Sequence, residues 1–251
     1  MTDPVVLTPA MKQYLDIKTQ HQDAILLFRM GDFYEMFFED AKTASQELEL
    51  TLTSRNKGKE DSVPLCGFPY HAASTYITKL VDRGYKVAIC EQMEDPKLAK
   101  GVVKRDVVRI VTPGLVVDED NLSPKENNFL AAVSYVEKHY GIAFVDLSTG
   151  EFRINESRDW DTFLSVLMTF QFRELILPES LPEKKRIKDR LGELLSCRIN
   201  EFPAVYFDVQ EAATLLREQF DAALMEEIDI FEKPCVLGAA GSALRYIRET
   251  Q

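Results

Sequence analysis

The sequence predicts a mixed α/β chain divided into two domains. Short apolar runs that end in Gly- or Pro-containing turns alternate with segments of helical periodicity, a pattern typical of α/β folds. Residues 116–128 are acidic and rich in turn-forming residues, which indicates a linker. Residues 1–115 hold 15 Lys and Arg against 16 Asp and Glu, a net charge of −1, whereas residues 116–251 hold 15 against 25, a net charge of −10. We therefore expect one domain over residues 1–115 and a second, with a different partner, over residues 129–251.

The composition bounds the class of protein. At 251 residues and 45% hydrophobic content, the chain can bury a sizeable core. Its apolar runs stay well below the ~18–20 residues of a membrane span, and no basic-then-apolar leader is present, so we expect a cytoplasmic protein with no membrane contact. The four cysteines form no CxxC pair and no cluster with histidine, which favours reduced thiols and argues against a metal site or a disulfide framework.

The first domain is expected to open with a helix at Thr8-Pro9, where an N-cap hydroxyl precedes a proline at the first helical position. Hydrophobic periodicity and turn signals then predict a buried strand over residues 24–27, a helix over 40–48, a strand over 50–53, a loop over 64–71, a helix over 72–83, and strands over 85–91 and 107–111.

The most informative stretch runs from Phe28 to Phe38, where aromatic residues surround a Gly31-Asp32 turn. Phe33 and Glu35 are two residues apart, so on an extended backbone they point to the same side. An aromatic side chain beside a hydrogen-bonding group can act as a wedge, which inserts between stacked bases of a nucleic acid and separates them. The alternative interpretation is that the aromatics belong to the core and that Glu35 is a solvated carboxylate.

Basic residues form two groups in the first domain. Arg55 and Lys57 lie in a polar turn, whereas Lys104, Arg105 and Arg109 border the expected strand over 107–111. Such side chains contact a phosphate backbone in nucleic-acid-binding proteins. A solvated loop and an ordinary charged hairpin are the alternatives.

The second domain is expected to begin with a three-strand meander followed by alternating helices and strands, an order that is ribonuclease-H-like. The expected strands cover residues 130–136, 141–147, 151–155, 174–178 and 198–202, and the expected helices cover 160–172, 183–195, 209–220 and 239–250. Nucleases of this fold keep a metal-binding carboxylate on a central strand, where Asp146 lies. No convincing second and third carboxylate follow, so we predict that Asp146 accepts hydrogen bonds from the backbone amides of Ser148 or Thr149.

Four ordered segments of the chain resemble the N-terminal domain of the MutS family of DNA mismatch-repair proteins. They are Gly31-Asp32-Phe33-Tyr34-Glu35-Met36-Phe37, Cys66-Gly67-Phe68-Pro69-Tyr70-His71-Ala72, Val87-Ala88-Ile89-Cys90-Glu91-Gln92 and Val107-Val108-Arg109-Ile110-Val111-Thr112-Pro113-Gly114. The similarity continues from Gly141 to the last residue. It implies a mixed-sheet mismatch-recognition domain followed by a ribonuclease-H-like connector domain.

The resemblance also implies roles for particular residues. Phe33 and Glu35 match the Phe-x-Glu signature that reads a mispaired base, and Met30, Tyr34 and Met36 would shape the base of the wedge, although core packing explains these three equally well. The implied partners are mismatched duplex DNA, a MutL-type repair protein on the connector domain, and a second copy in the full-length protein. DNA engagement would place the protein at the nucleoid.

Cofactors are not expected in this chain. Full-length family members bind ATP and Mg²⁺ through a C-terminal ATPase, but no G-x-x-x-x-G-K-[S/T] phosphate-binding motif is present here. We therefore interpret the sequence as an N-terminal fragment without enzymatic activity of its own.

Overall fold

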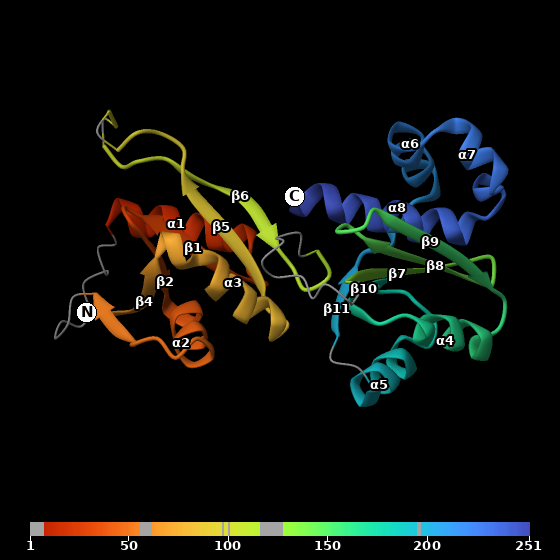
Figure 1. Cartoon of the computed structure of the whole chain (residues 1–251), viewed down its shortest axis with the longest axis horizontal. Coiled ribbons are helices and arrows are strands. Elements are labelled where there is room, and N and C mark those ends of the chain that lie inside the picture. Colours follow the sequence, from red (N-terminus) through yellow and green to blue (C-terminus); the bar gives the residue numbers. More distant parts are fainter. Residues whose placement is uncertain (1–7, 56–61, 97, 100, 116–127, 195–196) are drawn as a thin grey trace, which may run out of the picture. The chain divides into compact units, whose positions relative to one another are not determined.

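Two compact units make up the chain. The computed structural model describes residues 8–55, 62–96, 98–99, 101–115, 128–194 and 197–251. Contacts group the chain up to Thr112 into one unit and Pro113–Thr250 into another. Each unit has its own sheet and its own helices (Figure 1).

The first unit is a six-stranded mixed sheet in its described part, with strand order β3-β4-β2-β1-β5-β6. β1 pairs in parallel with β5, and the other neighbours are antiparallel. The strands are β1 (Ala24–Met30), β2 (Phe33–Phe37), β3 (Thr53–Arg55), β4 (Val63–Pro69), β5 (Lys86–Gln92) and β6 (Arg105–Val111), and the helices are α1 (Pro9–Gln20), α2 (Phe38–Glu47) and α3 (Ala73–Asp82).

Helices cover the two faces of this sheet. α1 begins as predicted, with the Thr8 hydroxyl accepting a hydrogen bond from the amide of Met11. Its Tyr14 packs edge-on against Phe28 of β1 and Phe37 of β2, which places the even-numbered residues of β1 on the α1 face. On the other face, Phe68 of β4 stacks on Tyr76 of α3. β2 is therefore an interior strand with a packed layer on each side.

Two sequence predictions in this unit were wrong. Residues 64–71 were expected to form a loop, yet most of them form β4, which pairs with both β2 and β3. The strand expected over 50–53 begins only at Thr53. The prolines indicated a loop, but Pro64 and Pro69 lie near the two ends of β4, where a missing amide hydrogen is tolerated.

The second unit contains a five-stranded sheet in its described part, with strand order β11-β10-β7-β8-β9. β7, β8 and β9 form an antiparallel meander, and β10 and β11 add in parallel beside β7. This is the ribonuclease-H-like order that the sequence predicts. The strands are β7 (Phe129–Val136), β8 (His139–Asp146), β9 (Glu151–Ser157), β10 (Phe172–Pro178) and β11 (Arg198–Phe202), and the helices are α4 (Trp160–Thr169), α5 (Lys184–Leu194), α6 (Val209–Gln219), α7 (Ala222–Glu227) and α8 (Pro234–Thr250).

Helix α8 is longer than predicted and lies against β7 and β8 (Figure 1). Its glycines are packing positions, because a β-carbon on Gly241 would come within 2.6 Å of the Ala212 backbone on α6. A β-carbon on Gly141 of β8 would similarly overlap the backbone of Cys235. Close approach of helix to helix and helix to strand therefore explains glycines that weaken the helical signal in the sequence.

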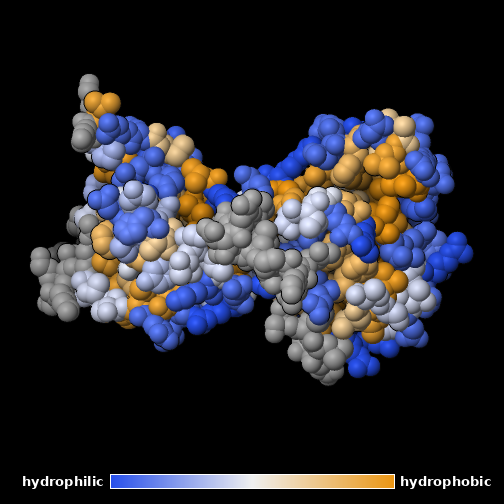
Figure 2. Space-filling view, in the orientation of Figure 1, coloured by the Kyte–Doolittle hydropathy of each residue, from blue (hydrophilic) through white to orange (hydrophobic). Residues whose placement is uncertain are grey.

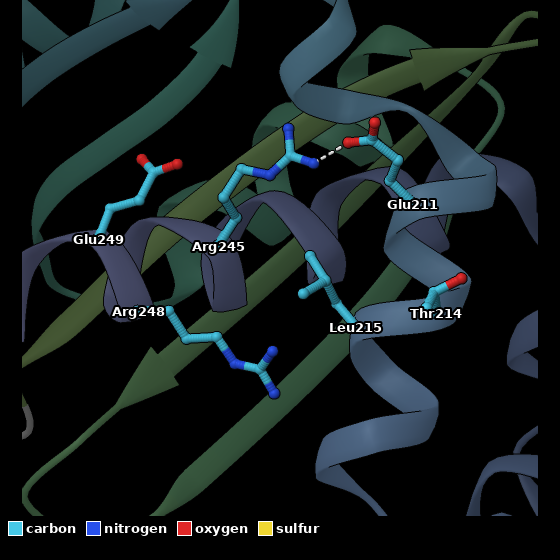
Figure 3. A pocket seen from close by; sticks show the side chains of 6 residues that line it. All are labelled: Glu211, Thr214, Leu215, Arg245, Arg248 and Glu249. Atoms are coloured by element: carbon cyan, nitrogen blue, oxygen red, sulfur yellow. Dashed lines mark hydrogen bonds and ion pairs between the residues drawn. The ribbon is translucent and has the colours of Figure 1, made fainter.

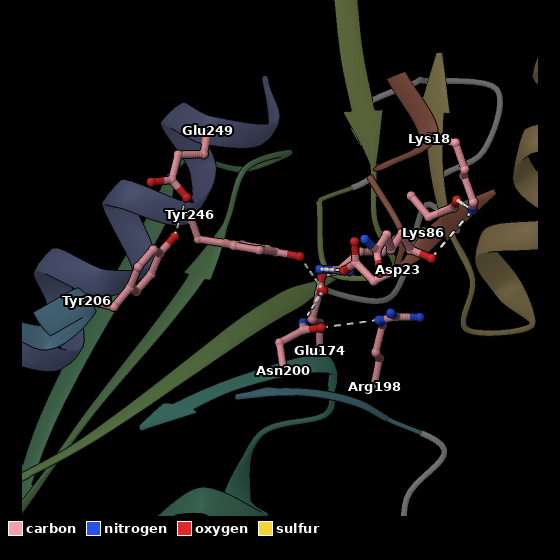
Figure 4. Close-up of polar contacts among 12 residues, drawn as sticks. Lys18, Asp23, Lys86, Glu174, Arg198, Asn200, Tyr206, Tyr246 and Glu249 are labelled. Atoms are coloured by element: carbon pink, nitrogen blue, oxygen red, sulfur yellow. Dashed lines mark hydrogen bonds and ion pairs between the residues drawn. The ribbon is translucent and has the colours of Figure 1, made fainter. Parts of the chain in front are cut away.

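A buried carboxylate joins several elements of the second unit. A β-bulge between Phe172 and Glu174 alters the register of β10 just before Glu174, which is fully buried. The Glu174 carboxylate accepts hydrogen bonds from the Tyr246 hydroxyl at 2.6 Å, the Asn200 amide at 2.6 Å and the Gly114 backbone amide at 3.1 Å (Figure 4). These three donors satisfy an acid that would otherwise be costly to bury.

The same contacts place residues 113–115 with the second unit. Leu115 is fully buried in the core that α8 shares with β7 and β8, and Gly114 bonds to Glu174. Residues 1–115 were predicted as the first domain, so the observed boundary lies a few residues earlier, after Thr112. The predicted linker over 116–128 lies outside the described residues except for Asn128.

Candidate nucleic-acid interface

A two-residue turn joins β1 to β2 and positions the predicted site. Met30 pairs with Phe33 across the turn, and Gly31 has a φ of 61°, a left-handed value that glycine adopts without strain. The Asp32 carbonyl accepts a hydrogen bond from the Tyr70 amide at 2.9 Å, and the Gly31 carbonyl accepts one from Arg29 Nε at 2.5 Å. The turn is therefore held by its own strand and by the residue after β4.

Phe33 is an exposed aromatic residue at the end of an interior strand. Its relative exposure is 45%, whereas Phe37, four residues further along the same face, is 1% exposed. Directly opposite residues of neighbouring strands share a face, and Phe33 lies opposite Met30 on one side and Pro69 on the other. The core-aromatic alternative therefore holds for Phe37 but not for Phe33.

Glu35 lies on the same face as Phe33, as the sequence predicts. It is opposite Phe28 on β1 and Gly67 on β4, and it is half-buried. A β-carbon on Gly67 would come 2.6 Å from the Tyr34 carbonyl oxygen and 3.4 Å from Glu35 Cγ. Glycine at this position therefore leaves room for the Glu35 side chain beside the backbone of β4.

On the other face of the hairpin, polar and aromatic side chains form a cluster. The Arg29 guanidinium lies 3.8 Å from the ring centroid of Tyr70 and 5.5 Å from that of Tyr34, and it forms an ion pair with Glu91 at 3.5 Å. The Tyr34 hydroxyl donates a hydrogen bond to the same Glu91 carboxylate. Burial, together with this hydrogen bond, raises the pKa of Tyr34 above its ordinary value, so the phenol stays protonated.

The three residues assigned to the base of the wedge have different surroundings. Met36 is fully buried and Tyr34 is 5% exposed, on the face away from Phe33, so core packing accounts for both. Met30 is half-buried on the Phe33 face, and its sulfur lies 3.5 Å from a nitrogen of Arg105. Of the three, Met30 is the one beside the predicted wedge.

The basic residues predicted to contact phosphate differ in their exposure. Lys104 is exposed and Arg109 is half-buried on β6. Arg105 is 8% exposed and bonds internally, so its prediction as a phosphate contact was wrong. Arg55 ends β3, but its side chain lies outside the described residues, as does the whole of Lys57. Sequence alone gave no signal that Arg105 would be buried.

Asp146 has the structural role that the sequence predicts. Its carboxylate accepts hydrogen bonds from the Ser148 amide at 2.9 Å, the Ser148 hydroxyl at 2.6 Å and the Asn128 amide at 3.1 Å. Three donors thus occupy a carboxylate that the nuclease alternative requires for metal binding. Among the residues that the structure describes, no three His, Cys, Asp or Glu side chains come together in a way that could hold a metal ion.

Among the described residues of the second unit, a larger and a smaller hollow can be distinguished. The larger, about 440 Å³, lies between α6 and α8, where Glu211 pairs with Arg245 (Figure 3). The smaller, about 200 Å³, is apolar and lined by β9, α6 and α7 residues such as Phe152 and Leu224, in a region where Figure 2 shows apolar surface. Each charged residue of the first hollow has a partner: Glu211 pairs with Arg245, Arg248 pairs with Glu218, and Glu249 accepts a hydrogen bond from the Tyr206 hydroxyl.

The fold and the hairpin together define the class: a two-domain α/β protein that presents an aromatic ring and a carboxylate at one end of its first sheet. None of the described helices has the length and apolarity needed to cross a membrane.

Comparison with known proteins identifies the family. A family model described as MutS domain I matches residues 8–120, and one described as MutS domain II matches residues 128–251. The chain therefore belongs to the MutS family of DNA mismatch-repair proteins.

Similar proteins named DNA mismatch repair protein MutS occur in several bacteria. The one from Myxococcus xanthus is 45% identical over 246 residues, which cover 98% of this chain and 27% of that protein. The one from Desulforamulus reducens is 45% identical over 251 residues, covering 98% and 29%, and the one from Bacillus licheniformis is 53% identical over 191 residues, covering 75% and 22%. The chain thus spans less than a third of the length of these relatives.

Proposed function

We propose that this chain recognises mispaired or unpaired bases in duplex DNA, with Phe33 inserted from the minor groove and Glu35 hydrogen-bonded to the exposed base. The observation that carries the proposal is the 45% exposure of Phe33 at the end of an interior strand, with Glu35 on the same face. Burial of a large aromatic side chain is favourable, so an exposed one at the end of a paired strand is available for insertion into a base stack.

The energetics of inserting Phe33 favour a mispaired step over a matched one. Stacking a base on Phe33 contributes about 1–3 kcal/mol, whereas unstacking a base step costs a few kcal/mol. The two contributions nearly cancel on sound DNA. A mispaired step is already loosened and easier to bend, so insertion there has the lower cost, and discrimination arises from the DNA.

Glu35 adds a chemical test of the exposed base. As a carboxylate it accepts a hydrogen bond, and when protonated in the field of the phosphates it donates one. A fixed anion near DNA also penalises binding to duplexes that offer it no donor. Lys104, Arg109, Arg55 and Lys57 remain predicted phosphate contacts.

Two protein partners complete the proposal. Residues 116–251, which make up nearly all of the second unit, hold a net charge of −10. This acidity suits a protein partner better than DNA, and we assign docking of a MutL-type repair protein to this unit. Pairing with a second copy belongs to a full-length MutS protein, as does ATP and Mg²⁺ binding.

The test compares mismatched and matched duplex binding by a full-length MutS protein that carries this chain. Phe33→Ala is expected to weaken binding to the mismatched duplex about 10-fold or more, with a much smaller effect on the matched one. Leu52→Ala is the control, because it truncates an apolar side chain of similar exposure, 47%, away from the hairpin. Equal weakening on both duplexes by Phe33→Ala would show that the ring is not a wedge.

A further inference from the structure

Arg105 is a buried cation on β6, which β5 separates from the hairpin of β1 and β2. It begins β6, is 8% exposed, and its burial lowers the pKa of the guanidinium below its ordinary value. Burying a charge is unfavourable unless hydrogen bonds and an opposite charge compensate it. The groups that compensate Arg105 therefore indicate what it does.

Its hydrogen bonds hold the end of β1. Arg105 Nε donates to the Arg29 carbonyl at 2.7 Å, and a terminal nitrogen lies 3.5 Å from the Met30 sulfur. The other terminal nitrogen donates to the Gln13 side chain at 3.1 Å and the Val103 carbonyl at 2.9 Å. Arg29 and Met30 are the last residues before the turn, and Met30 lies opposite Phe33. The guanidinium thus links the turn end of β1 to α1 and to the start of β6.

Its charge acts on Glu35. The Arg105 guanidinium lies 4.8 Å from the ring centroid of Phe28, and Phe28 is the residue directly opposite Glu35. The hydrogen-bond acceptors of Arg105 are neutral, whereas the Glu35 carboxylate interacts with it electrostatically. An interaction between a half-buried carboxylate and a buried cation is screened less than one between surface charges, so the positive charge of Arg105 favours orientations of the Glu35 side chain toward it.

We propose that Arg105 is a positioning residue for base discrimination, which fixes the end of β1 and supplies the positive charge that orients the Glu35 carboxylate. This inference rests on the proposed function, because it assigns Arg105 an effect on DNA only through the hairpin. Arg105 makes no contact with the DNA in this scheme. Its loss leaves Phe33 on the surface but removes the positive charge that favours one orientation of Glu35.

The experiment measures the ratio of mismatched to matched duplex affinity in a full-length MutS protein that carries this chain. Arg105→Met is expected to lower the ratio about 3- to 10-fold, and Arg105→Lys, which keeps the charge without the planar fork, to restore part of it. In a Glu35→Ala background, Arg105→Met should change the ratio less than about 2-fold, because the group through which it acts is gone. Lys104→Met removes a neighbouring exposed charge and should weaken both duplexes alike.

Several outcomes would overturn the inference. An unchanged ratio with Arg105→Met, or reductions that multiply in the double variant, would show that Arg105 does not act through Glu35. If Arg105→Met fails to fold, Gln13→Ala removes one acceptor of the guanidinium and is expected to lower the ratio in the same direction. Phe33→Ala in the same assay separates the two proposals: loss of discrimination there, with no effect at Arg105, refutes the positioning role alone.

Discussion

Glu35 on β2 lies directly opposite Gly67 on β4, and a β-carbon on Gly67 would come within 3.4 Å of Glu35 Cγ. The same added carbon would lie 2.6 Å from the backbone oxygen of Tyr34, which cannot move without disturbing the strand pair. The shape of the face that carries Phe33 and Glu35 thus depends on a residue that has no side chain.

We predict that Gly67→Ala both destabilises the first unit and disturbs the reading of the base. Overpacking against a fixed backbone is expected to cost about 1–3 kcal/mol in urea unfolding, and the ratio of mismatched to matched affinity should fall because Glu35 is displaced. Gly84→Ala is the control: its φ of 85° strains alanine, but nothing lies within 4 Å of the added carbon. It should destabilise without changing the ratio.

We predict that Asp146→Ala destabilises the second unit by about 1–3 kcal/mol, because the buried amide of Asn128 and the amide of Ser148 lose their acceptor. Urea unfolding with and without Mg²⁺ measures the effect. The wild-type unfolding midpoint should not depend on Mg²⁺. A Mg²⁺-dependent cleavage of DNA that Asp146→Asn abolishes would instead favour the nuclease alternative.

We predict a similar loss for Tyr246→Phe. The substitution removes a donor from the buried Glu174 carboxylate, which should cost about 1–3 kcal/mol in the free energy of unfolding. Tyr206→Phe is the matched control, since its hydroxyl donates to the exposed Glu249 at 2.8 Å and water can replace it (Figure 4). Equal effects of the two substitutions would contradict the importance of burial at Glu174.

The buried thiols give a prediction about alkaline pH. Burial raises the pKa of Cys66 to about 11 and that of Cys90 and Cys235 to about 12, from an ordinary value of 9.0. The native state therefore holds its thiol protons at a pH where the unfolded chain releases them. The resulting stability is complete below pH 9 and should fall as the pH rises toward 12.

Two measurements check this behaviour. Thiol-reactive reagents at pH 8 should label these cysteines slowly in the native chain and rapidly after denaturation. The free energy of unfolding should decrease between pH 8 and pH 10, and a variant with alanine at all three positions should show a smaller decrease. Rapid labelling of the native chain would contradict the assignment.

The sequence predicted the elements whose signals are local. The apolar run before Gly31-Asp32, the Thr8-Pro9 helix start and the Asp146 turn each depend on neighbours within a few residues, and each is confirmed. The position of Phe33 and Glu35 on one face of the strand follows from strand periodicity in the same way, whereas the exposure of Phe33 does not. These features need no knowledge of the rest of the chain.

Features that depend on distant residues were missed. Arg105 is buried and bonds to acceptors 76 and 92 positions away in the sequence, so its prediction as a phosphate contact, made from its position beside the strand over 107–111, was wrong. Helix α7 and the first turns of α8 were also missed. The glycines of α8 weaken the helical pattern, and their reason, contact with α6 and β7, is tertiary.

The double pairing of β2 has a mechanical consequence. Because β1 and β4 flank this strand and Arg105 and Arg29 hold the end of β1, the protein side of the proposed contact resists displacement. A hairpin that deforms little takes up little of the deformation energy, so most of the energy needed for insertion is spent on bending the duplex. Differences in affinity between DNA sequences then reflect how easily each sequence bends. A protein with a more flexible hairpin would lose this sensitivity even with Phe33 and Glu35 intact.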